Sequence, residues 1–254
     1  MICAIIQARM GSTRLPGKVL KPLIGDKTTL ELLYYRASQS TLIDKIIVAT
    51  TTSSEDDAIA DKCKKLKIDC FRGSQNDVLD RYFQAAKQFG KPKYIVRLTG
   101  DCPLHDATVI DQTISGFVKS NCDYGSNGNP CHYPDGLDVE IFTFQMLKTM
   151  WKNASLASER EHVTPYAYKN KDQFSIYSCS YPVNYSHLRW TLDEPEDYNL
   201  IKKIYHHFGS KNLLFSMQNI LKLIEKKPEL ATLNTHIKRN EGYKKSLKND
   251  PVLR

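Results

Sequence analysis

The segment from Arg9 to Lys18 concentrates residue types that bind phosphate. Two glycines, two small hydroxyls, two arginines and one lysine fall within these ten positions. Glycines let a backbone approach a ligand closely, successive N–H groups can form an anion-binding nest, and cations offset negative charge. The composition therefore suits a loop wrapped around a triphosphate, although an ordinary surface turn has a similar composition. Neither the Walker A pattern G-x-x-x-x-G-K-[ST] nor the dinucleotide pattern G-x-G-x-x-G is present.

An aspartate that could bind a metal follows an apolar run further along the chain. The run Tyr94–Thr99 predicts a buried strand, and Gly100, Asp101 and Cys102 come directly after it. Mg²⁺ prefers a few carboxylates together with phosphate oxygens and water. Asp101 is therefore a candidate magnesium ligand, with a turn or helix-capping role as the alternative.

Polar residues also follow the other predicted strands of the first half. The glycine-containing loop follows Ile2–Ile6, Thr50 ends the run Lys45–Thr50, and Arg72 follows Ile68–Phe71. Open α/β sheets bind ligands beyond the carboxyl ends of their strands. We therefore expect a nucleotide cleft along one edge of the sheet, with Thr50 and Arg72 beside the loop.

Strands and helices alternate through the first 120 residues. The expected N-caps of the helices are Thr28, Ser54, Ser74 and Asp106. This alternation predicts an α/β fold with a mostly parallel central sheet and helices on both faces. The second half is mixed. Its expected strands are Leu137–Phe142 and Phe174–Tyr181, and its expected helices are Phe144–Trp151, Ser158–Asn170, Glu194–Phe208 and Ser216–Glu225.

The net charge of +8 comes from the C-terminal part of the chain, because residues 202–254 contain 12 basic and 4 acidic residues. Such a segment can bind nucleic acid or a membrane surface. However, Lys222, Lys226 and Lys227 have the spacing of a solvated helix face, and no aromatic residue lies between these lysines. We therefore expect no nucleic-acid partner.

The remaining composition favours a cytoplasmic protein of one domain over residues 1–254. Seven cysteines without a C-x-x-C favour free thiols in a reducing compartment over a zinc site. No apolar run reaches the ~20 residues that span a membrane, and the N-terminus lacks the basic region of a signal peptide. No Gly-, Ser- or Pro-rich linker divides the chain.

The stretch Gln7–Leu20, Q-A-R-M-G-S-T-R-L-P-G-K-V-L, resembles the nucleotide-binding signature of cytidylyltransferases that activate acidic sugars. It is similar to the 3-deoxy-manno-octulosonate enzymes, and more closely to the acylneuraminate-like branch of spore-coat polysaccharide synthesis. The resemblance spans most of the chain. It implies a nucleotide-diphospho-sugar transferase fold of the GT-A type, CTP as substrate, Mg²⁺ as cofactor and a homodimer.

The resemblance also assigns roles to single residues. The strings G-D-C-P-L, which contains Asp101, and D-E-P-E-D, which begins at Asp193, resemble the metal-binding segments of the family. Asp101 and Asp193 are therefore expected to hold Mg²⁺. Lys18 and Arg14 would neutralise the β- and γ-phosphates and, with Asp101, form the catalytic set. The other expected contacts to the nucleotide are Ala8, Arg9, Gly11, Ser12, Thr50 and Arg72, and Arg81 is a further candidate for a phosphate or the sugar acid.

Two strings depart from the octulosonate and neuraminate enzymes, namely Tyr133–Glu140 and Ser158–Tyr166, and they leave the acceptor open. The residues that we expect to contact the acceptor are Asp135, Asp138, Glu140, Arg160, His162 and Arg189. A salt-bridged connection between sheet and helix is the alternative role for these charges. The implied organisation is a nucleotide-binding half at 1–120, an acceptor-binding and dimerisation half at 121–215, and a basic C-terminal helix and tail at 216–254.

The leading prediction is transfer of CMP from CTP to a nonulosonate or octulosonate sugar acid, with release of pyrophosphate. A phosphorylated sugar or polyol is an alternative acceptor, since Arg160 and Arg189 suit a phosphate. A glycosyltransferase that uses a finished nucleotide-sugar is less favoured, because the chain contains Asp135-x-x-Asp138 but no D-x-D. A non-catalytic nucleotide-binding subunit is also less favoured, because the expected phosphate-binding and metal-binding residues occur together.

Overall fold

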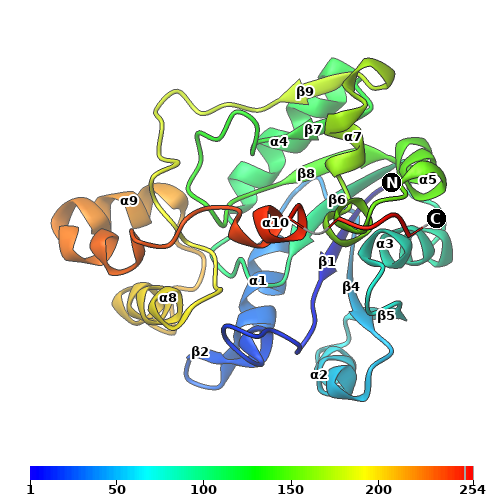
Figure 1. Cartoon of the computed structure of the whole chain (residues 1–254). Helices are drawn as coiled ribbons and strands as arrows, with labels where there is room; N and C mark the ends of the chain where they lie inside the picture. The colour runs from blue at the N-terminus through cyan, green and yellow to red at the C-terminus, as the bar shows by residue number, and fades with distance from the viewer. Residues whose placement is uncertain (249, 254) are drawn as a thin grey trace.

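A seven-stranded sheet with the order β5-β4-β1-β6-β8-β7-β9 forms the centre of the molecule (Figure 1). The computed structural model describes residues 1–248 and 250–253. From one edge to the other the strands are β5 Asp69–Gly73, β4 Lys45–Thr51, β1 Ile2–Gln7, β6 Tyr94–Thr99, β8 Glu140–Thr143, β7 Tyr124–Ser126 and β9 Ile176–Ser178. Within this sheet β8 alone runs antiparallel to its neighbours. The prediction of a mostly parallel sheet is therefore confirmed.

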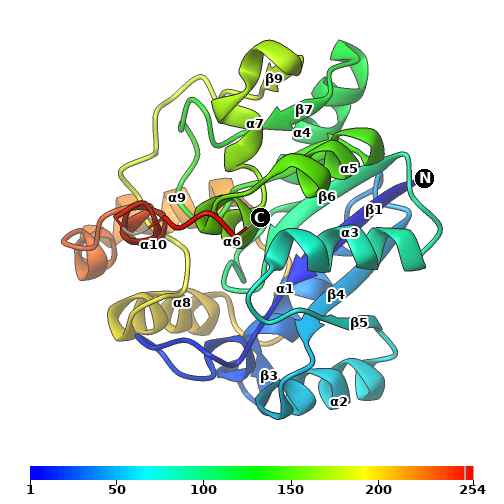
Figure 2. The same cartoon turned by 45° about the vertical axis from the view of Figure 1, so that its right-hand side comes forward.

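Helices pack on both faces of this sheet (Figure 2). One face is covered by α3 Val78–Gln88 and α5 Phe144–Asn153, and the other by α1 Thr29–Ala37, α2 Asp57–Leu66 and α4 Ala107–Ser120. Successive side chains of a strand point to opposite faces. Thus Ile5 of β1 packs with the α3 side and Ile6 with the α1 side. Burial on both faces explains why β1 and β4 read as largely apolar runs.

A third apolar cluster lies beside the sheet, around the buried Trp190. Its elements are α8 Pro195–Phe208, α9 Met217–Lys226, the 3-10 helix Pro228–Asn234 and the hairpin of β2 Pro22–Ile24 and β3 Lys27–Thr28. The apolar side of α9 enters this cluster through Ile220 and Leu223. Its lysines lie on the exposed side, which confirms the predicted solvated face.

Two of the four predicted helix caps are confirmed. Thr28 accepts a hydrogen bond from Glu31 N at the start of α1, and Asp106 accepts one from Thr108 N at the start of α4. These contacts satisfy backbone N–H groups that have no partner within their own helix.

The caps predicted at Ser54 and Ser74 are wrong. Ser54 opens a short 3-10 turn instead, and α2 begins only at Asp57. The cap of α3 is Asp77, whose carboxylate accepts from Asp80 N at 2.8 Å, whereas the Ser74 hydroxyl accepts from Asp77 N. A charged carboxylate interacts favourably with the positive end of the helix dipole, which favours Asp77 over the serine.

The helix predicted at Ser158–Asn170 is divided into α6 Ala157–His162 and α7 Pro165–Lys169. Val163 lies between them with a φ of 73°, outside the helical region. Pro165 begins the second helix, where its missing N–H costs nothing. The prediction was wrong because the apolar spacing continues through this break.

The expected strands of the second half are shorter than predicted. β8 begins at Glu140 rather than Leu137, because the Asn127 side chain bonds the backbone of Leu137 and Val139, each at 2.7 Å. β7 and the β2–β3 hairpin were not predicted, since each strand has only two or three residues.

The end of the chain returns to the body of the molecule as α10 Glu241–Ser246. Asn249 and Arg254 of the predicted tail at 216–254 lie outside the described residues. Among the helices of the described ranges, none combines the length and hydropathy of a membrane-crossing segment. α4 ends at Ser120, and the division of the chain into a nucleotide-binding half and an acceptor-binding half stays a prediction.

Candidate active site

A cleft of about 1010 Å³ opens where the central parallel strands end. β1 reaches it at Gln7 and β6 at Thr99. Gly100 brings the loops after these strands together, because its N–H donates to Gln7 O at 2.8 Å. A Cβ atom on Gly100 would lie 2.8 Å from the same oxygen, so a larger residue would push Asp101 away from β1.

The loop Ala8–Lys18 is held by its own backbone. Ser12 N and Gly17 N both donate to Met10 O, at 2.8 and 3.1 Å. Gly17 has a φ of 66°, which glycine adopts without steric cost. Asp56 fixes the loop from outside by accepting from Met10 N at 2.6 Å. The loop that was predicted to bind phosphate therefore has a defined conformation, with Lys18 at its end.

Lys18 lies between two carboxylates at the base of the cleft. Its Nζ is 2.6 Å from Asp101 Oδ2 and 2.7 Å from Asp193 Oδ1. Burial lowers the pKa of Lys18, but the two carboxylates outweigh burial and raise it. Burial likewise raises the pKa of Asp101, but the Lys18 ammonium holds it well below its usual value. Lys18 and Asp101 are therefore both charged at neutral pH.

Arg14 adds a second cation beside Lys18. Its guanidinium lies 3.1 Å from Asp193 and 2.9 Å from Glu194. The loop after β1 thus supplies both cations, whereas the carboxylates come from the end of β6 and from the residues before α8. Three segments that are far apart in the sequence meet at this point.

Asp101 and Asp193 converge on one position, which the Lys18 ammonium fills. Across residues 1–248 and 250–253, no group of three or more His, Cys, Asp or Glu side chains is arranged to hold a metal ion. Mg²⁺ is commonly held by one or two carboxylates and completes its shell with substrate phosphates and water. The two carboxylates fit such an ion when a nucleotide supplies the remaining oxygens.

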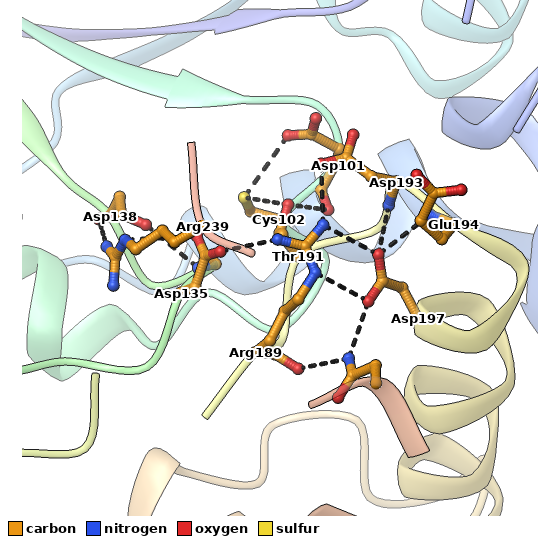
Figure 3. A network of polar contacts seen from close by, with 12 residues as sticks. Asp101, Cys102, Asp135, Asp138, Arg189, Thr191, Asp193, Glu194, Asp197 and Arg239 are labelled. Atoms are coloured by element: carbon orange, nitrogen blue, oxygen red, sulfur yellow. Dashed lines mark hydrogen bonds and ion pairs between the residues drawn. The ribbon is translucent and has the colours of Figure 1, made fainter. Parts of the chain in front are cut away.

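Arg189 pairs with Oδ2 of Asp193, the carboxylate oxygen that Lys18 does not contact (Figure 3). Its guanidinium lies 3.0 Å from Asp193, 2.9 Å from Asp135 and 3.0 Å from Asp197. Asp197 also accepts from the backbone N of Asp193 and Glu194, at 3.0 Å each, and so caps α8. Both the backbone and the carboxylate of Asp193 are therefore fixed.

The same network continues to Arg239, from the end of the chain (Figure 3). Its guanidinium forms an ion pair with Asp138 and lies 3.7 Å from Asp135. Burial and the neighbouring Asp138 raise the pKa of Asp135 to about 7, although Arg239 and Arg189 oppose the shift. The predicted acidic string 135–138 is thus neutralised by arginines on two different segments.

Glu140 is the centre of a second network in the cleft wall. It forms an ion pair with Arg97 of β6 and accepts hydrogen bonds from Tyr124 and Thr164, the latter at 2.7 Å. Arg97 Nε also donates to Gln7 Oε1 at 3.2 Å. These contacts join β1, β6, β7, β8 and the segment before α7 at one point of the cleft.

Most of the predicted site residues line this cleft. They are Ala8, Arg9, Gly11, Ser12, Arg14, Lys18, Asp101, Asp135, Asp138, Glu140, His162, Arg189 and Asp193. Their side chains come from both halves of the chain. The cleft therefore joins the predicted nucleotide and acceptor regions in one space.

Three predicted residues do not line the cleft, namely Thr50, Arg72 and Arg160. Thr50 is fully buried in β4. Arg72 donates to the carbonyls of Thr51 and Ser53, at 2.9 and 2.8 Å, and holds the turn before α2.

Arg160 is 1% exposed and is directed into the protein interior rather than into the cleft. It forms an ion pair with Asp77, the cap of α3, and donates to Trp151 O at 2.7 Å. The salt-bridged connection was the alternative role given to this residue, and the contacts of Arg160 agree with it.

Several cleft residues were missed from the sequence. Arg97 interrupts the otherwise uncharged strand β6, and a charge at that position was a usable signal. Lys238, Arg239, Tyr243 and Lys245 also line the cleft. No local pattern indicates them, because their position depends on how the C-terminal segment folds back.

Comparison with known proteins places the chain in one family. Residues 3–230 match the family of cytidylyltransferases. The chain is 40% identical over 245 residues to an uncharacterised protein of Methanocaldococcus jannaschii, covering 96% of this chain and 98% of that one. It is 34% identical over 238 residues to the spore coat polysaccharide biosynthesis protein SpsF of Bacillus subtilis, covering 91% and 97%.

Solved structures agree with this match. A cytidylyltransferase from Leptospira borgpetersenii has a TM-score of 0.85 and 36% identity, covering 91% of this chain and 96% of that one. A CMP-2-keto-3-deoxy-manno-octonic acid synthetase complexed with CTP has a TM-score of 0.59 and 16% identity, covering 81% and 98%, and it shows the shared fold alone. The chain therefore belongs to the cytidylyltransferase family and is a CTP-dependent nucleotidyltransferase.

Proposed function

We propose that this protein transfers CMP from CTP to an acidic sugar of the octulosonate or nonulosonate type, releases pyrophosphate, and serves surface polysaccharide or glycan synthesis. The observation that carries the proposal is the position of Lys18 between Asp101 and Asp193, with Arg14 beside them. Relatives support the substrate class. Half of the chain is 33% identical to a 3-deoxy-manno-octulosonate cytidylyltransferase of Geobacter sulfurreducens, and SpsF is named for polysaccharide biosynthesis.

In this reaction a hydroxyl oxygen of the sugar attacks the α-phosphorus of CTP. The bond from that phosphorus to the oxygen that bridges to the β-phosphorus breaks, pyrophosphate leaves with its electrons, and the hydroxyl proton passes to solvent. Phosphoryl-type transfers depend mainly on positioning and charge stabilisation. Lys18 and Arg14 would bind the departing phosphates, exchanging part of their contact with carboxylates for contact with CTP.

Asp101 and Asp193 would hold Mg²⁺, which when bound neutralises phosphate charge and increases the acidity of a hydroxyl. Neighbouring residues keep both carboxylates in a state that suits this role. Lys18 keeps Asp101 ionised, and Arg189 and Asp197 fix the orientation of Asp193. Since the ion would be shared with substrate phosphates, its binding would be coupled to CTP.

Arg81 supports an anionic ligand on the nucleotide side. Its side chain is 1% exposed, lines the cleft and donates to Ser74 O at 3.1 Å. Within the described ranges no carboxylate lies at ion-pair distance from it, and its Nε has no hydrogen-bond partner. A buried guanidinium without a counter-ion is costly, so an incoming phosphate would relieve that cost.

The two arginines that suited a phosphorylated acceptor are already paired within the protein. Arg160 and Arg189 were the residues that suited a phosphate. Arg160 is buried against Asp77, and Arg189 is shared by three carboxylates. Neither guanidinium is free to bind a dianion.

Two further expectations accompany this function. We propose a cytoplasmic enzyme, where CTP is available, and a homodimer formed through residues 121–215. Ile176 of the edge strand β9 and Val183 are exposed apolar residues in that region and support an interface there. Light scattering on the purified protein tests the dimer, and a monomeric mass would contradict it.

Pyrophosphate release tests the reaction. The protein is supplied with each of the four nucleoside triphosphates and Mg²⁺, against sugar acids that include 3-deoxy-manno-octulosonate and N-acetylneuraminate, and against sugar phosphates. We expect release with CTP and a sugar acid. Activity with UTP or GTP but not CTP would contradict the nucleotide assignment, and activity with sugar phosphates alone would contradict the acceptor assignment.

A further inference from the structure

The family match ends at residue 230, but the chain continues and returns to the cleft. After the 3-10 helix Pro228–Asn234, residues 238–243, 245 and 246 line the cleft. Figures 1 and 2 show this segment, in red, passing from the lobe of α8 and α9 towards α6. The part of the chain beyond the matched region therefore forms a wall of the same site.

The segment is anchored where it enters the cleft. Arg239 forms an ion pair with Asp138 and donates to Tyr133 O at 3.3 Å. It also lies 3.7 Å from Asp135, which is paired with Arg189. Through these contacts the segment is connected to the network that holds Asp193.

The segment is anchored again where it leaves the cleft. The Ser246 hydroxyl is 2.9 Å from His162 Nε2 and donates to Glu161 at 2.9 Å. The Tyr243 ring packs edge-on against the His162 ring, with centroids 5.1 Å apart. Further along, Asp250 accepts from the backbone N and hydroxyl of Ser158, at 2.7 and 2.6 Å. Both ends of α10 are thus fixed, and the helix between them has a defined place.

The cations of the cleft divide into two groups. Those that form ion pairs with carboxylates of the protein are Arg9, Arg14, Lys18, Arg97, Arg189 and Arg239. Three cleft cations have no ion-pair partner in the described part of the chain. One is Arg81, which is buried on the nucleotide side, and the others are the exposed Lys238 and Lys245. These two lysines lie on the C-terminal segment, so this wall brings unpaired positive charge to the cleft.

The anchors place this charge on the acceptor side. Asp138 and His162 belong to the two strings in which the sequence departs from octulosonate and neuraminate enzymes. Lys18 and Arg14, by contrast, are the residues proposed above to bind the phosphates, and they lie beside Asp101 and Asp193. A sugar acid brings a carboxylate to the same space, and a cation without an ion pair can bind it without first giving up another carboxylate.

We propose that the segment Lys238–Ser246 completes the acceptor-binding side of the cleft, and that Lys238 and Lys245 bind the carboxylate of the sugar acid. The inference rests on the proposed transfer of CMP to such an acid. It makes the C-terminal segment the part of the chain that selects for acceptor charge, separately from the residues that bind the nucleotide.

A double variant with Lys238→Ala and Lys245→Ala tests this proposal. Its matched control is Lys244→Ala with Lys248→Ala, because these lysines belong to the same exposed segment but do not line the cleft. Steady-state pyrophosphate release is measured with CTP and the sugar acid that the unmodified protein uses best. We expect the KM for the acid to rise about tenfold or more, the usual scale for a lost charge-assisted contact. The KM of the double variant for CTP should stay near that of the unmodified protein. The KM values of the control variant for the acid and for CTP should also stay unchanged.

The amide of the same sugar acid provides a second comparison. Since it carries no negative charge, the unmodified protein should use it poorly, and the double variant should lose nothing further with it. Thermal unfolding of both variants shows whether the fold is retained.

An unchanged KM for the acid in the double variant would overturn the role of the lysines and leave the proposed reaction intact. A rise in the KM for CTP alone would overturn it by assigning them to the nucleotide. If the unmodified protein uses sugar phosphates and no acid, the proposed function fails, and the carboxylate contact fails with it.

Discussion

The two sides of the cleft are held by different forces. On the nucleotide side, backbone hydrogen bonds of the parallel strands and of the loop after β1 fix the position of Lys18 and Asp101. On the acceptor side, charged side chains such as Arg189, Arg239 and Glu140 connect short elements to one another. Substitution of a side chain can rearrange the charged network of the acceptor side without disturbing the backbone hydrogen bonds of the nucleotide side. We therefore expect differences in substrate between proteins of this fold to arise on the acceptor side.

The largest effect is expected for Asp101→Asn. The amide keeps the shape of the side chain but loses the charge that would hold Mg²⁺ and that pairs with Lys18. We expect kcat to fall by about 10³-fold, the scale seen when a group that stabilises charge in the transition state is removed. Pyrophosphate release measures the loss, and thermal unfolding checks the fold.

Asp69→Asn is the control for this variant, because Asp69 is an exposed carboxylate of β5 that pairs with Lys45 at 2.9 Å. It should leave kcat unchanged. Turnover by Asp101→Asn at the rate of the unmodified protein would remove Asp101 from the site.

The nucleotide side could be predicted from the sequence because its signals are local. The run before Gln7 predicts β1, and the run before Gly100 predicts β6, so the position of Lys18 and Asp101 follows from the fold class. Thr28 and Asp106 were recognisable as caps for the same reason, since each satisfies its own helix.

The acceptor side could be predicted only in part. Asp135 and His162 were selected for their residue types, and they do line the cleft. Spacing could not distinguish an arginine that faces a ligand from one that fills an internal ion pair, which is why Arg160 was assigned to the acceptor. Arg239 contacts Asp138, about a hundred residues earlier in the chain, and no local pattern reports a contact of that range.

Arg160→Met tests whether Arg160 of the acceptor side contributes to the stability of the fold or to binding of the sugar acid. Removing one partner of a buried ion pair leaves the other without compensation, so we expect a loss of about 3 kcal/mol in the free energy of unfolding. The KM for the sugar acid should stay close to that of the unmodified protein. Urea unfolding and pyrophosphate release measure the two quantities.

Arg72→Met is a useful comparison, because the ion pair of Arg72 with Asp57 is much more exposed. Its cost in stability should be smaller. A raised KM for the acid in Arg160→Met, with stability unchanged, would show that Arg160 contacts the acceptor as its residue type suggested.

Acid should weaken the junction between the nucleotide side and the lobe of α8 and α9. Arg36 of α1 donates to the carbonyls of His105, Leu213 and Phe215 at this junction, at 2.8, 2.6 and 2.7 Å. His105 is fully buried, and neither ring nitrogen has a partner among the described residues. Burial, and then the charge of Arg36, lower the pKa of His105 to about 4.

The sign of the pH dependence follows from this shift. An unfolded histidine has a pKa of about 6.5, so between about pH 4 and 6.5 the unfolded chain binds more protons than the folded one. The stability contributed by neutral His105 is present above pH 6.5 and falls by about 2 kcal/mol between pH 6.5 and 5. Urea unfolding at several pH values measures this slope. His105→Leu should reduce it and the exposed His206→Gln should not, whereas an equal slope in all three proteins would contradict the assignment.

The smallest effect is expected for a substitution in α10, the helix near the end of the chain that forms part of the acceptor side. Gly242 lies inside this helix, and a Cβ atom placed there would meet no atom within 4 Å. Glycine in a helix interior costs about 1 kcal/mol relative to alanine. Gly242→Ala should therefore slow amide hydrogen exchange in residues 244–247, whose N–H groups donate within this helix, by up to about fivefold, and leave exchange in β1 unchanged.

The value of this small change is that it acts on the helix without altering any charge. An isolated helix of six residues is not stable in water, so the order of α10 depends on its anchors at Arg239 and Ser246. If the segment forms the acceptor wall, a more ordered α10 costs less to organise when the acid binds, and the KM for the acid should fall slightly while the KM for CTP does not. Slower exchange with a raised KM for the acid would mean that the helix must move away for the acceptor to bind. The C-terminal segment would then obstruct the acceptor rather than receive it.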